Sequence, residues 1–86
     1  MLSFGILQKI TIELREHFHR NDFLVCERTE KSLVVFFDKK YLEFKIEGFS
    51  HLLEDEIYLE HYIKEMEEHI SIVGFKEEIG NEETRN

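Results

Sequence analysis

A run of five apolar residues in the middle of the chain, Leu33-Val34-Val35-Phe36-Phe37, restricts the fold more than any other feature of the sequence. Its β-branched and aromatic side chains favour a strand. Because successive side chains of a strand point to opposite faces, this strand is apolar on both sides. The pattern fits the central strand of a sheet, and it raises the question of what covers the second side.

Two further strands are predicted beside this run. The central strand covers residues 33–38, and the flanking segments 23–28 and 41–47 also follow the two-residue period of strands. Only short connections separate the three segments, at residues 29–32 and at a tight turn over 38–40. Short connections between sequential strands predict an antiparallel meander. The third strand is expected to bury one face, which carries Leu42, Phe44 and Ile46.

An amphipathic helix is predicted before the strands, over residues 4–20. Ser3 is its expected N-cap, and Asn21-Asp22 ends it. Apolar residues recur here at three- and four-residue intervals, which places them on one stripe of a helix. The stripe consists of Ile6, Leu7, Ile10, Leu14 and Phe18.

A second, longer helix is predicted over residues 51–73, with Ser50 as its N-cap. Gly74 suits the left-handed residue that ends many helices, with Phe75 folding back on Ile70. Alternatively, the β-branched residues within 70–73 leave the helix as a short fourth strand. The stripe expected to face the core consists of Leu52, Leu59, Ile63, Met66, Ile70 and Val73.

These elements predict an α+β fold with the order α-β-β-β-α, a three-stranded antiparallel meander with two helices packed on one face. A chain of 86 residues is long enough for one core only. We expect a single domain over residues 1–75. Residues 76–86 hold one apolar side chain, Ile79, and are expected to form a disordered acidic tail, unless they cover the open face of the sheet.

The order of elements resembles that of the double-stranded-RNA-binding domain. That family grips phosphates with basic residues at the start of its second helix. The corresponding segment here reads Ser50-His51-Leu52-Leu53-Glu54-Asp55-Glu56, which would repel a phosphate backbone. The resemblance therefore supports the fold and argues against direct nucleic-acid binding.

Several functional classes are disfavoured by what the sequence contains. A single cysteine cannot form an intrachain disulfide, which favours a reducing, cytoplasmic compartment. No segment approaches the roughly 18–20 apolar residues of a membrane span. His61, Glu65 and His69 share one side of the second helix, but ligands on one exposed helix rarely suffice for a metal site. Cys26 is expected to be a small buried hydrophobe. We therefore expect no catalytic residues, no metal and no cofactor.

Charge is distributed very unevenly along the chain. The formal net charge is −8, and residues 1–42 contribute +1 whereas residues 43–86 contribute −9. Seven carboxylates and one lysine lie between Glu54 and Glu68. Such a surface either keeps a small protein soluble or competes for a basic groove by standing in for phosphates.

We therefore expect a small acidic binding protein that inhibits or regulates a basic, nucleic-acid-handling protein. Small acidic inhibitors of phage and bacterial origin, some of which block host defence, are similar in size and charge. Leu53 and Ile57 are the apolar residues expected beside the acidic contact surface. The full set of predicted partner-binding residues is Leu53, Glu54, Asp55, Glu56, Ile57, Glu60, Glu67 and Glu68.

The alternative is a structural or assembly subunit that forms a homodimer through the open face of the sheet. One side of the central strand remains apolar after the helices have covered the other, and monomers seldom expose a large apolar patch. The sequence leaves open which side this is. The residues predicted for self-association are Leu24, Val34 and Phe36.

Overall fold

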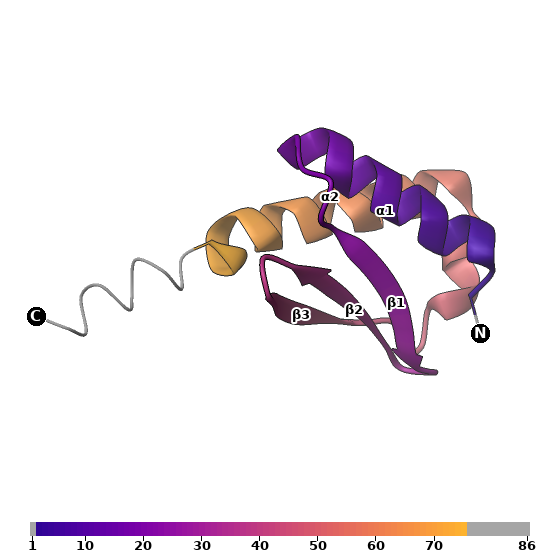
Figure 1. The fold of residues 1–86 in the computed structure, drawn as a ribbon. Helices are drawn as coiled ribbons and strands as arrows, with labels where there is room; N and C mark the ends of the chain where they lie inside the picture. The colour runs from indigo at the N-terminus through magenta and orange to yellow at the C-terminus, as the bar shows by residue number, and fades with distance from the viewer. Residues whose placement is uncertain (1, 76–86) are drawn as a thin grey trace, which may run out of the picture.

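A computed structural model of the protein describes residues 2–75. The predicted tail at 76–86, and the contact proposed for Ile79, lie outside these residues. The elements are α1 (Phe4–Phe18), β1 (Leu24–Thr29), β2 (Ser32–Phe37), β3 (Lys40–Lys45), the 3-10 helix η1 (Ser50–Glu54), α2 (Glu56–His69) and the π-helical turn η2 (Ile70–Gly74). The predicted α+β fold is confirmed, with a meander ordered β1-β2-β3 and both long helices on one face of the sheet (Figure 1).

The strand β2 lies between two antiparallel partners, as the apolar run at its centre predicts. Leu33, Val35 and Phe37 face the helices and are 0%, 0% and 2% exposed. Val34 and Phe36 therefore point to the other face, because side chains alternate along a strand. The register thus shows which face of β2 lies in the core, a point on which the sequence was ambiguous.

The helix α1 begins as predicted and ends two residues earlier than expected. Ser3 Oγ accepts a hydrogen bond from the Ile6 amide at 3.2 Å, and Ile10 and Leu14 on the predicted stripe are fully buried. The helix ends at Phe18 because His19 adopts a left-handed conformation with φ 55°.

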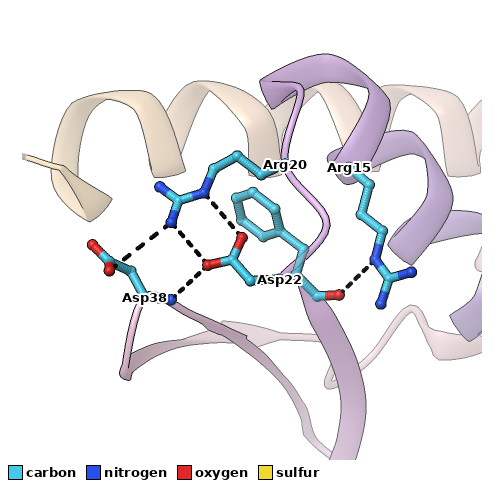
Figure 2. Close-up of polar contacts among 5 residues, drawn as sticks. Arg15, Arg20, Asp22 and Asp38 are labelled. Carbon is cyan, nitrogen blue, oxygen red and sulfur yellow. Dashed lines mark hydrogen bonds and ion pairs between the residues drawn. The ribbon is translucent and has the colours of Figure 1, made fainter.

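A polar network fastens the segment after α1 to the β2–β3 hairpin (Figure 2). The two residues of the hairpin turn, Asp38 and Lys39, both have positive φ, of 54° and 64°. Asp22 Oδ2 accepts a hydrogen bond from the Asp38 amide at 3.0 Å, and the Arg20 guanidinium donates to both carboxylate oxygens of Asp22. The hydrogen bond from Arg20 holds the pKa of Asp22 below its usual value. The network thus supports a turn that has no glycine to relieve its backbone strain.

The second helical segment begins differently from the prediction. Ser50 starts a 3-10 turn, and the N-cap of α2 is Asp55, whose Oδ1 accepts hydrogen bonds from the Ile57 and Tyr58 amides at 2.9 and 3.1 Å. The backbone of Asp55 is extended (φ −80°, ψ 122°), so the residues before it do not share the stripe of α2. Leu53 is consequently buried and Leu52 is 39% exposed, the reverse of the prediction.

The end of this segment also departs from the prediction. Residues 70–74 form a π-helical turn, so the alternative of a fourth strand there is wrong. The wider turn moves Val73 out of the core stripe, and Val73 is 42% exposed whereas Gly74 is buried. Gly48 is the one glycine with positive φ among the described residues, so Gly74 is not a left-handed cap.

Gly74 is instead required by close packing. A Cβ atom at this position would lie 2.8 Å from Phe37 Cζ and 3.2 Å from Ile70 Cγ2. The Phe37 ring cannot easily retreat, because it stacks on Phe23 at 4.9 Å between ring centroids and contacts Phe75 at 5.5 Å. Phe75 thus packs on Phe37.

We expect Gly74→Ala to destabilise the fold. Overpacking a core by one methyl group costs about 1–3 kcal/mol, and the better helix propensity of alanine offsets up to about 1 kcal/mol. The melting temperature should therefore fall by several degrees in calorimetry or circular dichroism. Gly5→Ala is the matched control, since among the described residues its Cβ would meet only Ser3 Oγ, at 3.9 Å, and this change should leave stability equal or higher. An equal response of the two variants would contradict the packing role of Gly74.

Candidate binding surfaces

Four of the predicted partner-binding carboxylates lie exposed on the second helical segment. They are Glu54, at the end of η1, and Glu56, Glu60 and Glu68 on α2. None of the four forms an ion pair with another residue in the part of the chain that the structure describes. Glu65, which was not among the predicted residues, is exposed on the same helix. These carboxylates are therefore available to basic side chains of a binding partner.

Other predicted partner-binding residues have structural roles. Asp55 is exposed but caps α2 with its carboxylate. Leu53 is fully buried, so its prediction as a contact residue is wrong, because the 3-10 turn rotates it into the core. Ile57 is 70% exposed, as predicted.

Glu67 does not lie on the exposed face where the prediction placed it. Its side chain is 14% exposed and turns toward α1, where His17 Nδ1 lies 3.4 Å from Glu67 Oε1. The groove between the helices is lined by Glu13, Glu60, Ile63, Lys64 and Glu67. Burial in this groove raises the pKa of Glu67, the negative charge of Glu13 adds to the rise, and His17 and Lys64 oppose it.

The open face of the sheet carries a transverse row of three exposed apolar side chains. Leu24 is paired with Phe36 across β1 and β2, and Phe36 is paired with Tyr41 across β2 and β3. Their exposed fractions are 50%, 43% and 57%. The Phe36 and Tyr41 rings contact each other, with centroids 6.0 Å apart. Tyr41 was not predicted for this surface, because it alternates with charged residues along β3.

An ion pair closes the other end of this face. Arg28 is the extra residue of a β-bulge in β1, and its Nη1 donates to Glu43 Oε1 on β3 at 2.9 Å. Because β2 separates the two strands, the pair spans β2, and Val34 on the same face is 5% exposed. Val34 thus lies on the predicted self-association face but is largely covered, and Cys26 beside it is half-buried.

No group of three or more His, Cys, Asp or Glu side chains within residues 2–75 could hold a metal ion. Over the same residues, no helix has the length and apolar character needed to cross a membrane.

Burial raises the pKa of Tyr62 well above its usual value, and its hydroxyl donates to the Lys45 carbonyl at 3.1 Å, which ties α2 to β3.

Comparisons with known proteins identify no relative. The chain matches no family model, no curated protein and no solved structure. The function of the chain is therefore inferred from its residues and their geometry.

The groove between the helices generates a prediction on pH. The folded state keeps a proton on Glu67 to higher pH than the unfolded chain, in which glutamates have a pKa of about 4.3. The stabilisation that the protonated Glu67 gives the fold is therefore fully present below the pKa of the unfolded state. It is lost as the pH rises through the higher pKa of the folded state. Glu67→Gln stays neutral, so its melting temperature relative to the unmodified protein should increase from about pH 4 to about pH 7.

The matched control is Glu68→Gln, one residue along the helix and exposed. Its melting temperature relative to the unmodified protein should change less over the same range, because its carboxylate stays in water. Parallel pH profiles for the two variants would contradict the placement of Glu67 in the groove.

Proposed function

We propose that the protein is a small, non-catalytic acidic binding protein that inhibits or regulates a partner protein with a basic surface. The observation that carries this proposal is the set of exposed carboxylates on η1 and α2 without ion pairs among the described residues: Glu54, Glu56, Glu60 and Glu68. A surface that served solubility alone would not need its negative charge gathered on one segment.

The fold separates this charge from the rest of the domain. Residues 50–69 carry seven carboxylates and one lysine, whereas residues 24–45, which form the sheet, carry five basic and four acidic side chains. Helix and sheet form opposite layers (Figure 1). The field of the molecule is therefore directional, and it would steer a basic partner toward α2.

The spacing along α2 supports the same partner chemistry. Glu56 and Glu60 are one turn apart, about 6 Å along the helix axis at 1.5 Å per residue. A row of unpaired carboxylates can occupy a groove whose lysines and arginines otherwise bind phosphates. The partner is therefore a protein that handles nucleic acid, and an anti-defence or immunity role of phage or bacterial type fits this size and charge. The free thiol of Cys26 agrees with a reducing, cytoplasmic compartment.

The proposal is tested by capture of the partner from an extract of the native host on the immobilised protein. A charge-mimicking contact should release the partner as salt rises, and short duplex DNA should compete, because exposed charges act through a screened field. The triple variant Glu56→Lys, Glu60→Lys, Glu68→Lys should weaken binding about 10- to 100-fold, given up to about 1 kcal/mol for each exposed ion pair that is lost and added repulsion.

The matched control reverses three exposed carboxylates away from α2: Glu16→Lys, Glu30→Lys and Glu47→Lys. It changes the net charge equally and should alter affinity by no more than about threefold. If both triple variants lose binding equally, the net charge rather than the α2 surface attracts the partner. If neither loses it and DNA does not compete, the acidic surface serves solubility and the proposal is wrong.

A further inference from the structure

We propose that the open face of the sheet is the interface of a two-fold symmetric dimer of this chain, in which β2 of one copy lies over β2 of the second. The row Leu24, Phe36 and Tyr41 supplies the apolar part of the contact, and each side chain in it is at least 43% exposed. The pair of Arg28 and Glu43 supplies the polar part, at the other end of the same face.

The arrangement of these residues is self-complementary. Consider a two-fold axis parallel to β2 and midway between two facing sheets. Rotation about it preserves position along the strands and exchanges β1 with β3, because β2 is the middle strand. Phe36 then meets Phe36 of the second copy, and Leu24 meets Tyr41 of the second copy. The packing of the sheets is the aligned kind, with strands within about 30° of each other.

The same rotation brings opposite charges together. Arg28 on β1 comes over Glu43 of the second copy on β3, since the two residues lie level enough within one copy to form a 2.9 Å ion pair. Two intact pairs thus become a ring of four alternating charges. This complementarity is specific to a second copy of the same face and would not arise with an arbitrary apolar partner.

The charge of the whole molecule is also compatible with this partner. Each copy carries −8, which opposes association through any acidic surface. The helices lie on the covered side of each sheet, so a face-to-face dimer keeps the two α2 helices apart by about three layers of roughly 10 Å. That separation exceeds the Debye length of about 8 Å at physiological salt.

The area of the open face of the sheet limits the expected affinity of the dimer. Three strands of six residues cover about 20 by 14 Å, from about 3.4 Å per residue and 4.8 Å between strands. This is well below the roughly 800 Å² per partner of stable complexes, so the dimer is weak and reversible. The dissociation constant of the dimer should therefore lie in the micromolar range.

Sedimentation of the purified chain over about 5 to 500 µM tests the dimer without any other partner, so its outcome is separate from that of the partner capture. The weight-average mass should rise from one chain toward two across this range. Phe36→Lys should keep the chain monomeric throughout, and circular dichroism should show an unchanged fold because Phe36 points outward. Ile57→Lys, which alters a still more exposed apolar residue on α2, should leave the association unchanged. A single-chain mass at every concentration would overturn the proposal.

A charge exchange tests the symmetry itself. Arg28→Glu and Glu43→Arg should each weaken dimerisation about tenfold or more, because each places like charges across the interface. An equimolar mixture of the two variants should associate at least about tenfold more tightly than either alone, since every contact between copies is then between opposite charges. An ion pair that matters only within one copy predicts no gain on mixing, and that result would overturn the proposed axis.

Discussion

Burial of the inner row of β2 is the contact on which the rest of the structure depends. Leu33, Val35 and Phe37 are at most 2% exposed, and complete burial of such side chains contributes about 1.5–3 kcal/mol each. β2 has a strand on either side, so its inner row forms the middle of the face that α1 and α2 cover. Phe37 extends this contact, because it stacks on Phe23 and leaves room for no side chain at residue 74.

One covered face and one open face together explain both candidate surfaces. Both helices lie against the inner row, whereas the outer row of Leu24, Phe36 and Tyr41 is 43–57% exposed. The same arrangement turns the exposed carboxylates of α2 away from the sheet. The acidic surface and the apolar row are therefore on opposite sides of a thin domain, and a dimer formed by one leaves the other free for a different partner.

Periodicity predicted what depends on local pattern and failed where the pattern depends on tertiary contacts. The change from a helical to a two-residue hydrophobic period predicted α1, with its Ser3 cap, and the meander that follows it. Both Ser50 and Asp55 can cap a helix, so the sequence did not show which of them begins α2. A stripe of period 3.6 also does not reveal the 3-10 turn before α2 or the π-helical turn after it. Leu53 and Val73 were therefore predicted on the wrong sides of the segment. The groove position of Glu67 depends on where α1 lies, and the cover over Val34 depends on a register that joins Arg28 to Glu43.

The most direct test of this account is the solvent exposure of the two faces of the sheet in solution. Paramagnetic relaxation of side-chain NMR signals by a soluble, uncharged probe, measured on a dilute sample, reports how closely each side chain approaches the solvent. We expect strong relaxation for Leu24, Phe36 and Tyr41 and weak relaxation for their strand neighbours Val25, Val35 and Phe37. Equal protection of both sets in a dilute, monomeric sample would show that another part of the chain covers the outer face, and it would contradict the one-sided sheet.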